Sequence, residues 1–140
     1  MGAGKRFSGG LKPGADRGPI IIAAVAAARS FAEDADLGER SAARLAVVVE
    51  ELVSNALRHG APDRWINVWL KLGSSPLGVA VGFEDDAGPF DPTIRPAFVG
   101  PDAETGGGVG LELVRAWAET FDYERVGDRN RIDIALRAAD

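Results

Sequence analysis

The chain has 140 residues, a formal net charge of −5 and hydrophobic residues at 46% of its positions. This length predicts one domain, and the hydrophobic content suffices for a core, which argues against a disordered chain. With no Cys and one His, the sequence excludes thiolate and multi-histidine metal sites as well as a cysteine nucleophile. The acidic net charge argues against a dedicated nucleic-acid surface, so we expect no direct nucleic-acid partner.

The amino-terminal residues 1–18 are rich in glycine and predict a flexible leader in which a short strand at 6–11 can form. The longest apolar stretch, residues 20–28, has about half of the roughly 18 residues that a membrane helix needs. We therefore expect a cytoplasmic protein without a membrane partner, with residues 19–138 as its single domain.

Hydrophobic periodicity along that domain predicts the order helix, helix, strand, strand, long loop, helix, strand, strand. Short turns between neighbouring strands favour an α+β fold, a two-layer sandwich whose mixed, mostly antiparallel sheet has helices packed on one face. The expected elements are helices at 20–35, 39–59 and 108–120, strands at 65–72, 77–84, 121–126 and 131–137, turns at 73–76 and 127–130, and a loop at 85–108.

A carboxylate and a carboxamide lie four residues apart on the second predicted helix. Glu51 and Asn55 therefore project from nearly one face, at the border of the apolar stripe. Such a pair can hold or orient a water, and the amide oxygen can ligate Mg²⁺. The simpler alternative is a solvated polar face, or two side chains that bond each other.

Acidic residues stand at the end of the second predicted strand. Asp85 and Asp86 come there, shortly before Gly88, so their carboxylates are expected at the rim of the sheet. A carboxylate in that position can accept a hydrogen bond from an exocyclic amine such as that of adenine. The alternative is that these residues form only a turn.

A glycine-rich segment precedes the third predicted helix. Glycines before a helix N-terminus leave backbone N–H groups free, and the helix dipole attracts a phosphate towards them. The alternative is a flexible linker, which explains the glycines but not their position before the apolar residues of a helix. The segment comprises Thr105, Gly106, Gly107, Gly108, Val109, Gly110 and Leu111.

In this order and spacing, the motifs resemble the ATP-binding superfamily of gyrase and the histidine kinases. They are Glu-x-x-x-Asn-Ala-x-x-His-Gly, an acidic strand end with Phe-Asp-Pro, and Gly-Gly-x-Gly-Leu-x-Leu-Val-Arg. The small size, the Phe-Asp-Pro at 90–92 and a closing hairpin with Tyr123-Glu124-Arg125 and Asn130-Arg131 resemble the anti-sigma factor serine/threonine kinases within it. The resemblance spans about residues 20–137 and implies the Bergerat ATP-binding fold.

The resemblance also implies a role for each motif. Glu51 would be the catalytic carboxylate that activates the attacking hydroxyl, and Asn55 would be the Mg²⁺ ligand. Backbone N–H groups from Gly108 to Leu111 would hold the phosphates of ATP, and residues 91–107 would form a short lid. We count the whole glycine-rich segment among the ATP-binding residues.

The adenine ligand has two candidates. The superfamily pattern Asp-x-Gly fits Asp86 and Gly88. Apolar residues two, four and six positions before the aspartate, and the distance to Phe90, favour Asp85 instead, which puts Ala87 where glycine is usual. We favour Asp85 and keep Asp86 as the alternative, with Gly88 in the site.

The single histidine and the tryptophans have simpler interpretations. His59 invites the interpretation of a phosphoacceptor, but the family has a helix-ending histidine there, so we expect a capping and packing role. Trp65, Trp69 and Trp117 are most simply core or interface residues. No dimerisation helix with its own acceptor histidine precedes the domain, so we do not expect a complete sensor histidine kinase.

The leading hypothesis is therefore an ATP- and Mg²⁺-dependent serine/threonine kinase. It would bind a sigma factor and phosphorylate a small anti-sigma factor antagonist, and the family implies a homodimer. The second hypothesis is a non-catalytic, ATP-dependent module that sequesters a protein partner. A third is a scaffold that binds no nucleotide.

Overall fold

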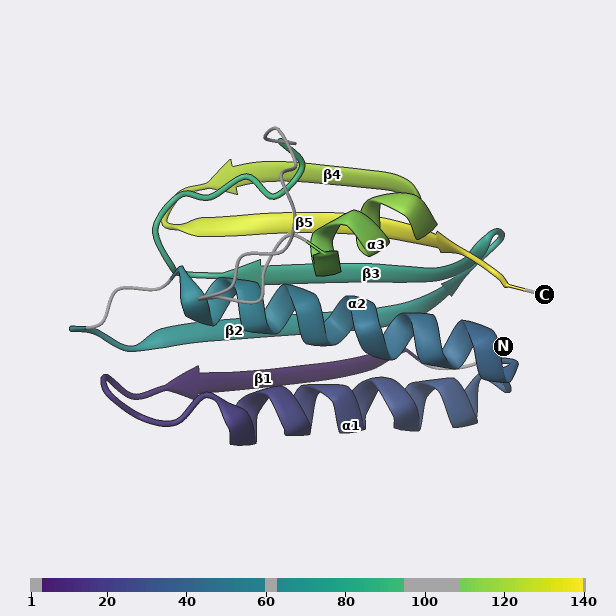
Figure 1. Cartoon of the computed structure of the whole chain (residues 1–140), viewed down its shortest axis with the longest axis horizontal. Coiled ribbons are helices and arrows are strands. Elements are labelled where there is room, and N and C mark those ends of the chain that lie inside the picture. The colour runs from purple at the N-terminus through teal and green to yellow at the C-terminus, as the bar shows by residue number, and fades with distance from the viewer. Residues whose placement is uncertain (1–3, 60–62, 95–108, 140) are drawn as a thin grey trace.

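The computed structural model describes residues 4–59, 63–94 and 109–139, and its strands form one sheet. The five strands lie in the order β1-β2-β3-β5-β4, from the bottom to the top of Figure 1. Every neighbouring pair is antiparallel, so the described sheet is antiparallel throughout rather than mixed. The strands are β1 (Lys5–Leu11), β2 (Ile66–Ser75), β3 (Gly78–Asp85), β4 (Ala118–Val126) and β5 (Arg129–Arg137).

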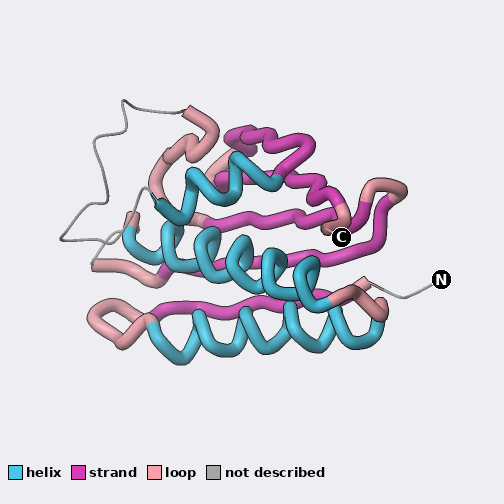
Figure 2. The backbone as a smooth tube through the Cα atoms, turned by 45° about the vertical axis from the view of Figure 1, so that its right-hand side comes forward, coloured by secondary structure: helices cyan, strands magenta, loops and turns pink. Residues whose placement is uncertain are grey.

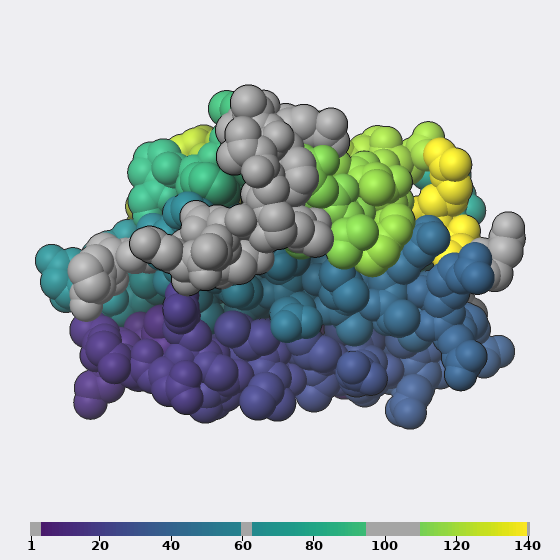
Figure 3. Space-filling view, in the orientation of Figure 1, coloured from purple at the N-terminus to yellow at the C-terminus, as the bar shows by residue number. Residues whose placement is uncertain are grey.

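Helices cover one face of this sheet. In the described part of the chain they are α1 (Gly18–Asp34), α2 (Glu39–Arg58) and α3 (Val109–Trp117). Both ribbon views place α1 and α2 side by side over the β1–β2–β3 half and α3 over the other half (Figures 1 and 2). From this side, α1 and α2 form one continuous surface (Figure 3). The predicted α+β sandwich with helices on one face is confirmed.

The core lies between the two layers because each element buries one face. Along β3 the buried residues alternate and end with Asp85, and α2 buries residues at spacings of three and four. Each fully buried valine or leucine contributes about 1.5–3 kcal/mol relative to exposure. The most deeply buried large side chains are Leu45, Val48, Val49, Leu52, Val53, Val68, Leu72, Val81, Phe83, Pro92 and Val114.

The first strand lies within the segment predicted as a leader. Residues 5–11 form β1, which pairs with β2 from Lys5 opposite Leu72 to Leu11 opposite Ile66. It is an edge strand of the described sheet. The helix that follows begins at Gly18, two residues before the predicted start, with Pro in its first turn, where its missing N–H costs nothing.

Three further boundaries differ from the prediction, each because strand pairing extends further than the sequence pattern indicates. The turn predicted at 73–76 is shorter, since β2 continues to Ser75, which pairs with Gly78. The third helix ends at Trp117 rather than residue 120, since Ala118 already pairs with Leu136. Arg129 and Asn130, predicted in the last turn, belong to β5.

The final turn is therefore Gly127-Asp128. Gly127 has a φ of 61° in this two-residue loop, a conformation that favours glycine at the first central position of a tight hairpin.

Among the described residues, no helix combines the length and the apolar character needed to cross a membrane.

Candidate functional site

The carboxylate of Glu51 lies at the inner border of α2, where its side chain is 16% exposed. Its Oε1 atom is buried and accepts no hydrogen bond. Its ion-pair partner is the Arg58 guanidinium, whose Nη2 lies 3.6 Å from Oε1, a distance too long for a hydrogen bond. Because buried acceptors are nearly always satisfied, this oxygen is open to a partner that the described residues do not supply, such as a water, an ion or a substrate group.

The start of α3 packs directly against this carboxylate. A Cβ placed on Gly110 would overlap the carboxyl group of Glu51, so only glycine allows this approach. The contact brings the N-terminal turn of α3, with its positive dipole end, next to the carboxylate on α2. The structure thus joins two motifs that are far apart in the sequence.

Asn55 lies one turn further along α2 and is 6% exposed. Its Oδ1 accepts a hydrogen bond of 3.2 Å from Nη2 of Arg58. The other terminal nitrogen of that guanidinium donates to the Ser54 hydroxyl at 3.3 Å. Arg58 therefore bridges the carboxylate of Glu51 and the carboxamide of Asn55. These two side chains do not form a hydrogen bond with each other, which was one of the simpler alternatives.

Asp85 is the last inward-facing residue of β3 and is 4% exposed. One of its oxygens, Oδ1, accepts hydrogen bonds from the Ala87 backbone N–H at 3.0 Å and from Nδ2 of Asn130 at 2.9 Å. Burial raises the pKa of Asp85, and these two hydrogen bonds oppose the shift only in part. The side chain lines a small pocket together with Leu52, Asn55, Ala56, His59, Phe83, Ala87, Gly88, Phe90, Asn130 and Ile132.

Asp86 is occupied elsewhere. Its carboxylate accepts two hydrogen bonds from Asn67, one from the backbone N–H at 2.7 Å and one from Nδ2 at 2.9 Å. Its backbone carbonyl accepts a hydrogen bond from Arg64. Asp86 therefore fastens the end of β3 to the start of β2, and it does not line the pocket of Asp85.

Asn130 organises the loop after β3, a role that sequence reasoning missed. Its Nδ2 donates to Asp85 and to the Gly88 carbonyl, both at 2.9 Å, and is 3.5 Å from the Ala87 carbonyl. Its Oδ1 accepts from the Tyr123 hydroxyl at 2.6 Å. The same oxygen accepts from the Phe90 N–H and from Arg125, each at 3.3 Å.

The only available sequence signal was the position of Asn130 in the closing hairpin, next to Arg131. That match indicated a resemblance but no contact. Arg125, on the neighbouring strand, completes the cluster by donating to the Ala87 carbonyl at 2.8 Å. The loop between Asp85 and Phe90 is therefore held from β4 and β5.

His59 forms the end of α2, in agreement with the expected capping and packing role. Its backbone N–H donates to the Asn55 carbonyl at 3.1 Å. Its ring stacks on Phe90 with a centroid distance of 4.0 Å and an interplanar angle of 15°. Partial burial, and then the charge of Arg58, lowers the pKa of His59, while the charge of Asp85 opposes this. The neutral ring is thus favoured as a wall of the pocket.

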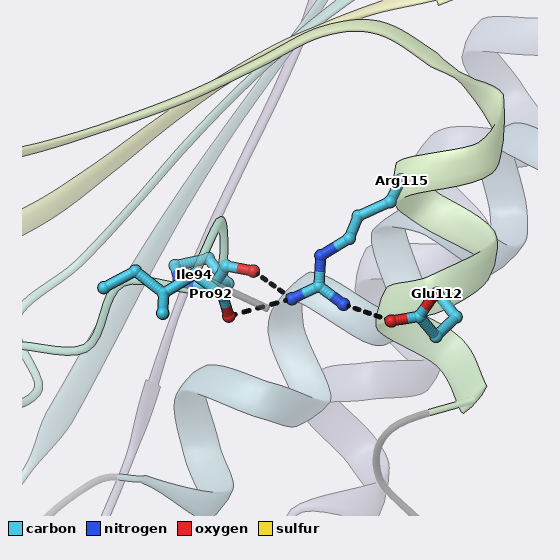
Figure 4. A network of polar contacts seen from close by, with 4 residues as sticks. All are labelled: Pro92, Ile94, Glu112 and Arg115. Atoms are coloured by element: carbon cyan, nitrogen blue, oxygen red, sulfur yellow. Dashed lines mark hydrogen bonds and ion pairs between the residues drawn. The ribbon is translucent and has the colours of Figure 1, made fainter. Parts of the chain in front are cut away.

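Arg115 connects α3 to the loop that follows Phe90, as the close-up shows (Figure 4). Its Nη2 donates to the carbonyl oxygens of Pro92 at 2.6 Å and Ile94 at 3.2 Å, and its Nη1 pairs with Glu112 at 2.9 Å. Asp91 closes the same turn by accepting from the backbone and the hydroxyl of Thr93. The described beginning of the predicted lid is therefore tied to α3.

The glycine-rich segment is described only in part. Thr105, Gly106, Gly107 and Gly108, with most of the predicted lid, lie outside the described residues. Val109 begins α3, Gly110 contacts Glu51, and Leu111 is buried at 9% exposure. The phosphate-binding role of this segment therefore stays a prediction.

A comparison with known protein families matches residues 21–136 to the histidine kinase-like ATPase domain. Because the match covers most of the chain, the chain belongs to this family. Membership supports ATP binding, and it agrees with a sheet covered on one face by helices. A search of curated proteins finds no match.

Proposed function

We propose that this chain is a cytoplasmic ATP- and Mg²⁺-dependent serine/threonine protein kinase of the anti-sigma factor type. Its partners would be a sigma factor and a small antagonist protein, which it phosphorylates. The proposal depends on the Glu51 carboxylate, which lies beside Asn55 and the start of α3. Its Oε1 atom is buried and accepts no hydrogen bond. Because the chain belongs to an ATPase family, ATP would be the phosphoryl donor. The Glu51 carboxylate would then be the base beside it.

The adenine of ATP would bind in the pocket lined by Asp85. The Oδ2 of this carboxylate can accept a hydrogen bond from the exocyclic amine, because the hydrogen bonds from Ala87 and Asn130 both end on Oδ1. Asp86 is the weaker candidate, since Asn67 holds both of its oxygens. We therefore propose Asp85 as the adenine ligand, with Asn130 as the residue that positions it.

The oxygens available at the site suit Mg²⁺. Asn55 offers an amide oxygen, a hard ligand, close to the Glu51 carboxylate, provided that the Arg58 guanidinium moves away from Oδ1. Among the described residues, no group of three or more His, Asp or Glu side chains is gathered as a metal cage. Such a site fits a cation that takes one protein ligand together with phosphate oxygens and waters.

In the proposed reaction, the acceptor hydroxyl of Ser or Thr would lie against Glu51. Oε1 takes the hydroxyl proton while the hydroxyl oxygen bonds to the γ-phosphorus, and the bond from that phosphorus to the ADP oxygen breaks. Bound Mg²⁺ supplies charge neutralisation at the phosphates. The N-terminal turn of α3 adds backbone N–H groups and a positive dipole end on the phosphate side.

The test is phosphoryl transfer from ATP to a cognate antagonist protein by the wild type and by Glu51→Gln. General-base catalysis contributes about 10²–10⁴-fold, so the variant should transfer at least about a hundredfold more slowly while binding ATP normally. Equal rates in the two proteins would remove Glu51 from the mechanism.

A specific contact favours one alternative. Because Arg58 holds the Oδ1 of Asn55, the chain could bind ATP without Mg²⁺ and act as a non-catalytic module that sequesters a partner. Such a protein would bind ATP equally well with EDTA and would release no ADP with any antagonist. The kinase proposal expects tighter binding with Mg²⁺ and ADP release.

A homodimer is part of the proposal. The exposed edge of β1 supports it, because an edge strand offers unpaired backbone groups to a second copy. Sedimentation equilibrium with and without ATP tests it, and a mass that stays monomeric at high protein concentration would contradict it.

A further inference from the structure

The sheet face turned away from the helices gathers positively charged side chains. Alternate residues of each strand point to this face, and they bring Arg6 from β1, Lys71 from β2, and Arg129 and Arg131 from β5 around one hollow. The hollow measures about 520 Å³. This gathering of cations stands out in a chain whose net charge is −5.

Two of these cations oppose each other directly. Arg6 pairs with Lys71 in the β1–β2 register, and both side chains are exposed. Neither makes a side-chain hydrogen bond or an ion pair with a residue that the structure describes. Like charges directly across a strand pair destabilise a sheet, so this pair costs stability unless an anion lies between the two side chains.

The floor and the far wall of the hollow suit an elongated ligand. Gly82 on β3 forms the floor, and a Cβ there would lie 3.7 Å from an oxygen of Asp133, an ordinary van der Waals contact, so a side chain can be added there without a clash. Trp69 forms a flat wall under the Arg129 guanidinium, which lies 3.8 Å from the ring centroid. Arg129 also pairs with Glu84 at 3.4 Å, and Arg131 pairs with Asp133 at 3.6 Å. Among the cations that line the hollow, this leaves Arg6 and Lys71 without an anionic partner in the described part of the chain.

We propose that this hollow, lined by Arg6, Trp69, Lys71, Gly82, Arg129 and Arg131, binds an acidic segment of a protein partner. Carboxylates of the segment would lie between Arg6 and Lys71, and its backbone would run over Gly82. The hollow opens on the face opposite the pocket of Asp85, so the proposal does not depend on nucleotide binding.

Charge complementarity favours an acidic protein segment over other ligands. Glu84 and Asp133 also line the hollow, and they would repel the continuous phosphate backbone of a nucleic acid. A second copy whose two-fold axis passes between Arg6 and Lys71 would bring these cations against their own copies. A peptide with spaced carboxylates can reach Arg6 and Lys71 and avoid the two acids.

The test measures binding of a fluorescein-labelled peptide of alternating glutamate and serine by fluorescence anisotropy at low ionic strength. The informative variant is Arg6→Glu with Lys71→Glu. Its matched control is Arg17→Glu with Arg40→Glu, two exposed arginines outside this face that change the net charge equally. In a third variant, Gly82→Leu, the added side chain fills part of the hollow without changing the net charge.

The wild type should bind the peptide, and added salt should weaken the binding. The Arg6/Lys71 variant should lose about tenfold in affinity or more, Gly82→Leu should also bind more weakly, and the control should stay within about twofold. ATP binding should be the same in all four proteins, which separates this proposal from the proposed kinase function.

Other results would overturn the proposal. One is that the wild type does not bind the peptide, and another is that the Arg6/Lys71 variant and the control lose peptide affinity equally. A third is that labelled oligothymidine binds as tightly as the peptide. Self-association of the wild type that only the Arg6/Lys71 variant abolishes would make a second copy the occupant and would likewise reject it.

Discussion

The contact between Gly110 and Glu51 allows a sharp test of the site, because one added methyl group should move the carboxylate that we propose as the catalytic base. In Gly110→Ala, the new Cβ would overlap the Glu51 carboxyl group. That carboxyl group is the far end of a flexible side chain, whereas Gly110 is fixed in the backbone of α3, so Glu51 moves. The carboxylate then leaves its position beside Asn55.

The expected effect is large on catalysis and small on stability. Displacing a general base removes a contribution of about 10²–10⁴, so the rate of phosphoryl transfer should fall about a hundredfold or more. Alanine in place of glycine stabilises the middle of a helix by about 0.5–1 kcal/mol. At the second residue of α3 this gain sets an upper limit to the part of the cost of moving Glu51 that it offsets. Urea unfolding should therefore give nearly the wild-type free energy of unfolding.

The assay is single-turnover transfer from radiolabelled ATP to the antagonist protein. Gly73→Ala is the matched control, because a Cβ on Gly73 meets nothing within 4 Å. Its transfer rate should match that of the wild type.

A double-mutant cycle with Glu51→Gln decides the cause. If Gly110→Ala acts by displacing residue 51, it should add almost nothing to the loss that Glu51→Gln causes. Additive losses would refute the reasoning and would show that Gly110 acts on the phosphates instead.

Three further changes test the remaining contacts of the site. Asp85→Asn should abolish detectable ATP binding. Because burial raises the pKa of Asp85 above 3.8, the wild type loses stability as pH rises through the raised pKa, where the buried carboxyl group ionises. The variant should therefore unfold at a higher urea concentration than the wild type at neutral pH, and this difference in unfolding midpoint should shrink towards pH 3. An unchanged gap across that range would contradict the burial argument. Asn130→Ala should lower the free energy of unfolding by about 3 kcal/mol, measured with urea, because it leaves several buried groups unpaired; a loss below about 1 kcal/mol would reject its central role. Arg115→Met should raise the KM for ATP about fivefold by releasing Pro92 and Ile94 from α3, and an unchanged KM would show that the loop holds without it.

The parts of the site that depend on local periodicity could be predicted from the sequence. Helical spacing put Glu51 and Asn55 on one face of α2, and strand alternation favoured Asp85 over Asp86 as the inward residue; in the structure Asp85 is buried in the pocket. Both inferences use residues that are close together in the sequence, within one element or, for Phe90, five positions beyond Asp85. For the same reason, the predicted order of helices and strands was correct from α1 onwards, whereas β1 was expected only as a strand that can form in a leader.

The parts that depend on contacts between distant residues could not be predicted. Asn130 bonds Asp85 across 45 positions of the sequence, and Arg115 reaches Pro92 across 23. No spacing rule links such residues, because the fold alone brings them together. The boundary errors have a related cause: the pairing of Ala118 with Leu136 ends α3 where helix propensity alone would continue it.

The central claim, that ATP binds in the pocket of Asp85 with Mg²⁺ on Asn55, is tested most directly by isothermal titration calorimetry. Mg-ATP should bind the wild type with one site per chain, bind Asp85→Asn undetectably, and bind Asn55→Ala with an affinity that no longer responds to Mg²⁺. No heat of binding to the wild type at millimolar Mg-ATP, or equal affinities in the wild type and Asp85→Asn, would contradict the account.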